Sequence, residues 1–168
     1  MNDNDHQLPA TCHPDTVTLY RYWREKCRGR RMPARADIDP VEMPVRLLPC
    51  LMLVDVVPDE RRFVYRLVGT GEVEVRGNDP TGKSVIEGFF GTTVEDALSW
   101  YTRCVETKAP LVDAEPFVAI NGRYITEETI FLPLSDDGVN VNMIMVFSHS
   151  SRARPSVEFP EMVRRSVA

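Results

Sequence analysis

The chain has 168 residues, of which 43% are hydrophobic, and a formal net charge of −5. This length suits one domain with short extensions and allows a hydrophobic core that is stable without disulfides or a structural metal ion. The negative charge argues against a general nucleic-acid-binding protein, since phosphates attract basic surfaces. Neither a membrane-spanning stretch nor a signal peptide is visible. The four cysteines are widely spaced, which indicates reduced thiols in a cytoplasmic protein and no zinc site, because zinc ligands usually come in close pairs.

The N-terminal third is predicted to precede the main sheet. Residues 1–13 are polar and are expected to be disordered. A helix is predicted from Asp15 to Arg28, because apolar residues recur there at helical spacing. Its stripe comprises Val17, Leu19, Tyr20, Trp23 and Cys27. An extended linker follows, and Asp39 is expected to cap a short helix that ends near Leu48, so that residues 14–49 hold helix, linker and short helix.

Two β-branched and aromatic runs around a turn predict a β-hairpin. The runs are Leu51–Val57 and Phe63–Val68, with Pro58–Arg61 between them. Alternation places Phe63, Tyr65 and Leu67 on one, buried face of the second strand. Arg66 is expected to pair with Asp55 across the hairpin rather than bind a carboxylate ligand.

The rest of the core is predicted to contain one long helix and three strands. Short helical segments are expected near residues 72–76 and 85–90. The long helix covers Thr92 to Thr107, with Thr92 and Glu95 as a capping box. The strands are predicted at 111–119, 124–134 and 141–148. This order gives an α+β fold with helices on one face of an antiparallel sheet. The core then spans 50–150, and residues 151–168 form a tail.

Five segments resemble a family of small stand-alone PAS-domain proteins of proteobacteria. They are YWR at 22–24, PARADIDP at 33–40, LLP at 47–49, YRLVGT at 65–70 and GNDPTGK at 77–83. The resemblance implies a PAS fold with strand order 2-1-5-4-3 and an N-terminal flanking helix. It also implies a sensor of small molecules, redox state or light that dimerises through a flanking helix. Arg35 and Asp37 match the family motif and are candidates for a structural ion pair.

A ligand cavity between helices and sheet is one interpretation of the aromatic and methionine residues, and simple core filling is the other. The candidate ligand-binding residues are Tyr65, Leu67, Phe89, Phe90, Trp100, Tyr101, Met143, Met145 and Phe147. Glu127 and Glu128 are expected to be solvated or ion-paired rather than catalytic.

Val17, Tyr20 and Trp23 are the candidate dimer interface, because an exposed aromatic stripe usually marks an interface. The alternative is a monomer whose own sheet covers the stripe. Arginines at 24, 28, 30, 31 and 35 form a local basic patch. They are interpreted as helix-end and linker charges rather than as an anion site.

These features predict a non-enzymatic sensory module that binds a small ligand or a signalling partner and forms a homodimer. No catalytic motif is present, and no metal ligand set or cofactor is assigned. One alternative is a small isomerase-like or dehydratase-like enzyme on a similar curved sheet, which a buried carboxylate of raised pKa would favour. The other is a pure protein-interaction domain.

Overall fold

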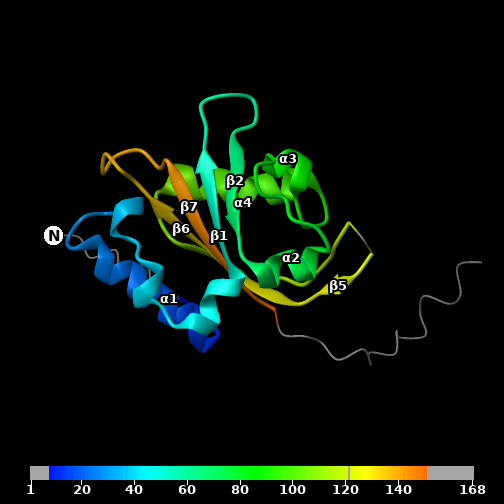
Figure 1. Ribbon diagram of the computed structural model, residues 1–168, viewed down its shortest axis with the longest axis horizontal. Coiled ribbons are helices and arrows are strands. Elements are labelled where there is room, and N and C mark those ends of the chain that lie inside the picture. Colours follow the sequence, from blue (N-terminus) through cyan, green and yellow to red (C-terminus); the bar gives the residue numbers. More distant parts are fainter. Residues whose placement is uncertain (1–7, 121, 151–168) are drawn as a thin grey trace, which may run out of the picture.

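A five-stranded antiparallel sheet forms the centre of the computed structural model, which describes residues 8–120 and 122–150 (Figure 1). The strand order is β2-β1-β7-β6-β3. The strands are β1 (Leu51–Val56), β2 (Phe63–Val68), β3 (Leu111–Asp113), β6 (Glu127–Leu134) and β7 (Met143–Ser150). When the five strands predicted from the sequence are numbered in chain order, this arrangement is the expected order 2-1-5-4-3. The α+β PAS-type architecture is confirmed.

The third and fourth predicted strands are each interrupted. Beyond β3 and before β6, the short strands β4 (Phe117–Val118) and β5 (Tyr124–Ile125) pair with each other in a separate two-stranded sheet. Pro116 lies in the break between β3 and β4, and a proline has no amide to donate to a strand ladder. The long hairpin expected from the sequence is therefore two short ladders.

Helices cover both faces of the sheet, not one face alone, because the predicted N-terminal flanking helix lies on the face opposite to the other helices. The helices are α1 (Pro14–Cys27), α2 (Thr70–Arg76), α3 (Val85–Gly88) and α4 (Val94–Thr107), and Figure 1 shows α1 and α4 on different sides of the strands. Trp100 and Tyr101 of α4 pack on Phe131 of β6. Side chains of neighbouring strand residues point to opposite faces, so Ile130 and Leu132 face the α1 layer, where both are fully buried.

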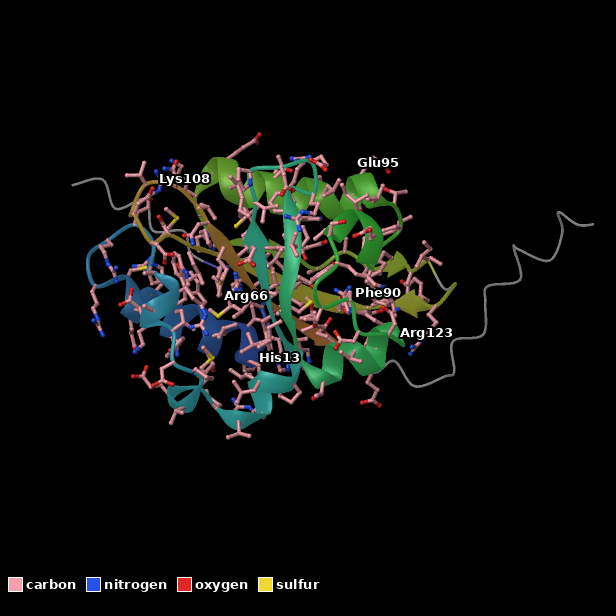
Figure 2. All side chains as sticks on the ribbon, turned by 45° about the horizontal axis from the view of Figure 1, so that its top comes forward. His13, Arg66, Phe90, Glu95, Lys108 and Arg123 are labelled. Atoms are coloured by element: carbon pink, nitrogen blue, oxygen red, sulfur yellow. The ribbon has the colours of Figure 1, made fainter. Side chains whose placement is uncertain are left out.

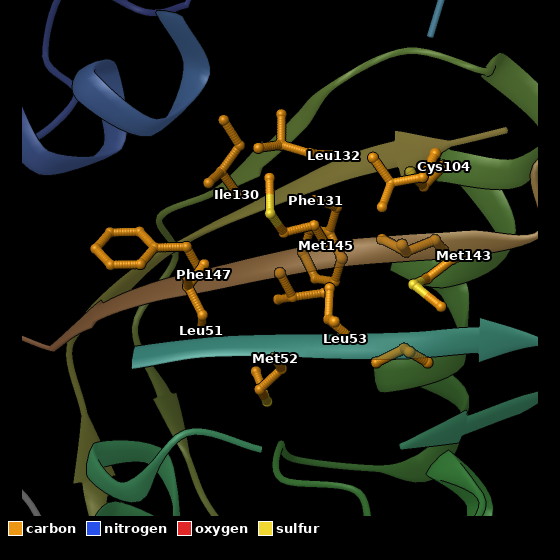
Figure 3. Close-up of a cluster of buried hydrophobic side chains, with 14 of the residues drawn as sticks. Leu51, Met52, Leu53, Cys104, Ile130, Phe131, Leu132, Met143, Met145 and Phe147 are labelled. Carbon is orange, nitrogen blue, oxygen red and sulfur yellow. The ribbon is translucent and has the colours of Figure 1, made fainter. Parts of the chain in front are cut away.

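The α1 layer is a dense apolar core. Leu19 is 0% and Trp23 3% exposed, and the Trp23 indole N–H donates to the Pro133 carbonyl at 3.0 Å. Met145 pairs with Leu132, and Phe147 with Ile130, on the same face of the sheet (Figure 3). The sheet of the same chain therefore absorbs much of the apolar stripe of α1.

The segments around α1 differ in part from expectation. Residues 8–13 were expected to be disordered, but Leu8 packs against the core and the His13 amide donates to Glu128; residues 1–7 and the tail 151–168 lie outside the described residues. Asp39 is a cap, as predicted, and its carboxylate accepts from the Val41 amide at 2.9 Å.

Instead of one short helix, the chain forms 3₁₀ segments at Pro40–Glu42 and Val45–Cys50, with a third at Arg35–Asp37. Prolines at 44 and 49 explain the change, because each removes an amide donor.

Two further expectations are corrected by local hydrogen bonds. The N-cap of α4 is Thr93, not Thr92, and its hydroxyl accepts from the Asp96 amide at 3.1 Å. The ion pair of Asp37 is with Arg30, at 2.6 Å. Arg35 instead donates to the Ile38 carbonyl.

A bulge in β2 reverses the predicted orientation of Leu67. Leu53 pairs with Leu67, but the next residue, Val54, pairs with Tyr65, so Arg66 is the extra residue. One extra residue moves the following side chains to the other face. Leu67 is consequently 47% exposed, whereas Tyr65 is buried. The predicted Arg66–Asp55 pair is present at 2.8 Å, and Figure 2 labels Arg66 on the exposed surface of the strand.

Candidate functional site

A cavity of about 60 Å³ lies between the sheet and the helices α2 and α4. Its floor comes from β1, β2, β6 and β7, and its walls come from α2, α4, the segment between α3 and α4, and the stretch from β3 to β4. The lining residues are Met52, Tyr65, Arg76, Phe90, Gly91, Asp96, Ala97, Trp100, Tyr101, Asp113, Glu115, Phe117, Glu127, Thr129, Phe131, Val146 and Ser148. Aromatic surface and ionisable groups thus meet in one small space.

Arg76 is the buried cation of this cavity. It lies in the last turn of α2, and its side chain is 6% exposed. The guanidinium carbon lies 5.2 Å from the Tyr65 ring centre and 5.3 Å from the Phe90 ring centre. One terminal nitrogen, Nη1, donates to the Gly88 carbonyl at 3.2 Å and, at 3.4 Å, to the Tyr65 hydroxyl. The two rings and these bonds hold the planar group in one orientation.

The remaining donors of Arg76 are poorly satisfied. Nη2 contacts the thioether of Met52, at 3.3 Å, and sulfur is a weak acceptor. Nε lies 3.6 Å from the Glu72 carboxylate and has no hydrogen-bond partner among the described residues. Burial, followed in size by the opposing effect of Arg76, leaves the pKa of Glu72 above its ordinary value.

Glu127 is the partly buried acid of the cavity. It is the first residue of β6, and its Oε2 atom is buried with no hydrogen-bond partner in the described part of the chain. Burial, and secondarily the negative charge of Glu72, raises the pKa of Glu127 to about 7, against a partial opposing effect of Arg76. Glu127 is therefore less solvated than the sequence suggested. At neutral pH this carboxyl group exists in both protonation states and can donate or accept a hydrogen bond.

Aromatic side chains pack against one another in the wall of the cavity. Trp100 stacks on Phe131 with ring centres 5.8 Å apart and an interplanar angle of 7°. Tyr101 meets Phe131 edge-on at 5.3 Å. On the opposite rim, Phe90 meets Phe117 of β4 edge-on at 6.0 Å. Such offset and edge-on pairs are the favoured aromatic geometries.

The structure brings some of the sequence-predicted ligand-binding residues together and separates others. Tyr65, Phe90, Trp100 and Tyr101 line the cavity, whereas Phe89 does not. Leu67 is displaced by the β2 bulge. Met143, Met145 and Phe147 belong to the α1-side core (Figure 3). In β7 the cavity face is instead carried by Val146 and Ser148.

Arg76, Glu127 and Phe131 are cavity residues that sequence reasoning did not select. In the sequence Arg76 is the last residue of the short helical segment predicted at 72–76, and nothing in that pattern marks it as buried. A signal for Glu127 was present: Glu127, Thr129 and Phe131 alternate on one face of the fourth predicted strand. The aromatic member shows that this face is covered, so the carboxylate on it is also covered.

The candidate dimer residues lie in two different environments. Trp23 is buried against the sheet, so it is part of the chain's own core. Val17 and Tyr20 are half-buried and line an open groove with Leu8 and Pro9. Only these two of the three candidates remain accessible to a second subunit.

The basic patch near the end of α1 is mostly occupied by local contacts. Arg30 donates to the Cys27 and Lys26 carbonyls and to Asp37. Arg31 donates to the Thr107 carbonyl at 2.8 Å. These bonds support the interpretation of the patch as helix-end and linker charges.

Three ligand-type side chains that are distant in sequence meet on the other side of the sheet. His13, Asp15 and His149 have potential metal-ligating atoms within 4.8 Å of one another. No metal ligand set was predicted from residue spacing in the sequence, and this cluster was not expected. Among the described residues, no helix combines the length and apolarity needed to cross a membrane.

A family model described as a PAS domain matches residues 11–146. No curated protein matches the sequence. Among solved structures, a point variant of RsLOV is similar at 15% identity and a TM-score of 0.49, covering 66% of this chain and 65% of that chain. The PAS domain of the fruit-fly ELK potassium channel has 13% identity and a TM-score of 0.46, over 60% of this chain and 85% of that chain. The Vibrio cholerae VqmA dimer has 13% identity and a TM-score of 0.47, over 66% of this chain and 49% of that chain.

Proposed function

Because the chain belongs to the PAS-domain family, we propose that it is a sensory module that binds a small polar ligand in the cavity between its sheet and α4. The module has no catalytic activity of its own in this proposal. The observation that carries it is the presence of Arg76 and Glu127 in the cavity lining, each with a buried polar atom that lacks a hydrogen-bond partner among the described residues.

An unpaired buried polar group costs about 1–3 kcal/mol. Native structures therefore satisfy such groups, often with water or a ligand. The Glu72 carboxylate, which forms an ion pair with Arg76 Nε at 3.6 Å, already offsets part of this cost for Arg76. A ligand that accepts a hydrogen bond from Arg76 and exchanges one with Glu127 reduces both remaining costs. The aromatic walls favour a ligand with an apolar or planar body. A small carboxylic acid, amide or hydroxylated heterocycle has these properties.

The cavity limits the size of the ligand. Its volume of about 60 Å³ corresponds to roughly four to six water positions. This favours a metabolite of few heavy atoms over a flavin-sized cofactor. Larger ligands require Phe90 and its edge-on partner Phe117 to move apart, since they form one rim.

The path from the cavity to α1 is short. Glu127 lines the cavity, and the next residue of β6, Glu128, accepts two hydrogen bonds from the His13 amide at 3.0 and 3.2 Å. His13 is the N-cap of α1. A ligand with different affinities for two positions of β6 shifts the population of two placements of α1. We further propose that α1 passes this shift to a second subunit or a signalling partner.

Native mass spectrometry of freshly purified protein tests the ligand proposal directly. We expect a small molecule to be retained by the wild-type chain and lost from Arg76→Met, with the exposed Arg66→Gln as the matched control. A thermal-shift panel of small carboxylic acids and amides gives a second readout. A wild-type chain that retains nothing and shows no shift with any compound contradicts ligand sensing and favours the pure interaction domain.

The raised pKa of Glu127 also supports a second candidate, an enzyme of proton transfer. A general acid or base works best with a pKa near the working pH, and the pKa of Glu127 is about 7. Among the lining residues no histidine accompanies it. Turnover of a small carbonyl or hydroxy acid that disappears in Glu127→Gln but survives in Glu95→Gln would make this the function.

A further inference from the structure

His13 and His149 lie face to face although they stand near opposite ends of the described chain. Their ring centres are 3.4 Å apart, and the interplanar angle is 12°. The Asp15 carboxylate lies 4.0 Å from His13 Nδ1. All three residues are partly buried, on the α1 side of the sheet and away from the ligand cavity.

The fold holds each member of this cluster in place. The His13 main chain is anchored by Glu128, which is the direct cross-strand partner of His149. His13 Nδ1 accepts from the Asp15 amide at 3.2 Å as the helix cap. Arg46 donates twice to Asp15 Oδ1, at 3.0 and 2.8 Å, so the other carboxylate oxygen, Oδ2, is the one that faces His13.

We propose that His13, Asp15 and His149 form a binding site for a divalent transition-metal ion such as Zn²⁺, which ties the start of α1 to the end of β7. Two imidazoles and one carboxylate are typical ligands for zinc and its neighbours, whereas calcium and magnesium require oxygen ligands. With three protein ligands, the fourth coordination position is left for water or an exchangeable group.

The chemistry of the cluster favours a cation. Imidazole binds metals in its neutral form. Asp15 and Glu128, which accepts from the His13 amide, bring two carboxylates to the cluster, against the one positive charge of Arg46 on Asp15. A metal ion also replaces a face-to-face contact of two polar rings with two strong bonds.

Binding requires a small rearrangement that gives the site a recognisable signature. Ligand atoms bound to tetrahedral zinc at about 2.0–2.2 Å are roughly 3.4 Å apart, so atoms now within 4.8 Å must close up. Nitrogen lone pairs lie in the ring planes, so the stacked rings must tilt apart. Coordination of His13 through Nε2 leaves the bond from the Asp15 amide to Nδ1 in place, whereas coordination through Nδ1 removes the acceptor of that amide.

The test uses the full-length, tag-free chain, cleared of metal with a chelator and titrated with ZnCl₂. We expect one zinc ion per chain by calorimetry and a rise in melting temperature of about 5–10 °C once zinc exceeds the Kd a hundredfold. Co²⁺ in place of zinc should give the visible absorption of a tetrahedral nitrogen–oxygen site. Hydrogen exchange should slow at the first turn of α1.

Matched variants locate the binding. His149→Gln and Asp15→Asn should each weaken zinc binding by at least about tenfold, while His6→Gln and the exposed Asp59→Asn should not. His149→Gln leaves the helix cap intact, so cooperative melting of that variant without zinc shows that the fold persists. Zinc binding that is absent in the wild type, unchanged in His149→Gln, or lost only in His6→Gln overturns the proposal.

Discussion

Gly69 lies so close to Pro49 that a Cβ atom on Gly69 would come within 2.3 Å of the Pro49 carbonyl oxygen. The Gly69 amide also donates to the Leu51 carbonyl at 2.8 Å, which prevents the backbone from withdrawing. Two of the segments that resemble PAS proteins, LLP at 47–49 and YRLVGT at 65–70, therefore meet at this point. The glycine is required by a close approach of two backbones and not by its φ angle.

Replacing Gly69 with Ala should lower the free energy of unfolding by about 1–3 kcal/mol or more, because the added carbon overpacks a site bounded by backbone. Urea denaturation measures the change. Gly91→Ala is the matched control, since its added carbon would meet nothing closer than 3.9 Å. Equal stability of the two variants would show that the Gly69 contact relaxes without cost.

Leu67→Asp should be tolerated, although simple alternation along β2 predicts that it unfolds the domain. Leu67 is 47% exposed because of the bulge at Arg66, and exposed substitutions usually change stability by less than about 0.5 kcal/mol. Leu132→Ala, at a fully buried position, should cost about 2–5 kcal/mol. Thermal melting of both variants distinguishes the bulged strand from a regular one.

The bulge also shows which features of the fold can be predicted from the sequence and which cannot. Hydrophobic periodicity and turn residues predict the helices, the strands and their order, because these signals are local and repeat along the chain. The pairing of Leu53 with Leu67 and of Val54 with Tyr65 depends on contacts between strands. No local pattern marks Arg66 as the extra residue, so the predicted orientation of the Leu67 side chain was wrong.

The candidate site was only partly predictable for the same reason. The aromatic residues Tyr65, Trp100 and Tyr101 were selected as apolar wall residues, and all three line the cavity. Arg76 became a cavity residue through burial by Tyr65 and Phe90, which only the tertiary structure reveals. The contact of the His13 and His149 rings joins the two ends of the described chain, so sequence spacing could not indicate it.

Glu127→Gln should make the protein more stable above neutral pH. The pKa of Glu127 is raised from 4.5 to about 7 in the folded state, so between these values the unfolded chain loses the proton and the folded chain keeps it. Stability falls as pH rises through this window. A difference of one pKa unit corresponds to about 1.4 kcal/mol, so the loss in free energy of unfolding approaches about 3 kcal/mol at pH 8. The glutamine variant has no such loss.

The measurement is the difference in unfolding free energy between wild type and Glu127→Gln at pH 5 and at pH 8. Using the difference cancels the contributions of the other carboxyl groups. Glu95, an exposed residue of α4 labelled in Figure 2, provides the control variant Glu95→Gln, which should track the wild type. A constant difference for Glu127→Gln at both pH values would mean that the Glu127 carboxyl group ionises normally.

Tyr20→Ser should dissociate the proposed homodimer and leave the monomer folded. Tyr20 and Val17 are half-buried on the outer side of α1 and line an open groove, where an apolar patch favours association. Light scattering should give a dimer mass for the wild type and a monomer mass for Tyr20→Ser, with Ile86→Ser, a variant of an exposed residue of α3, still dimeric.

Trp23→Ala should act differently, because the Trp23 side chain extends from α1 into the core and donates to the Pro133 carbonyl. Its loss should cost about 3–5 kcal/mol of stability, so any loss of the dimer in that variant should accompany unfolding. Deleting residues 1–29 would uncover Ile130 and Leu132 and confuse the two effects, which is why point variants are the better test. A wild-type monomer, or a Tyr20→Ser dimer as tight as the wild type, would exclude this face of α1 as the interface.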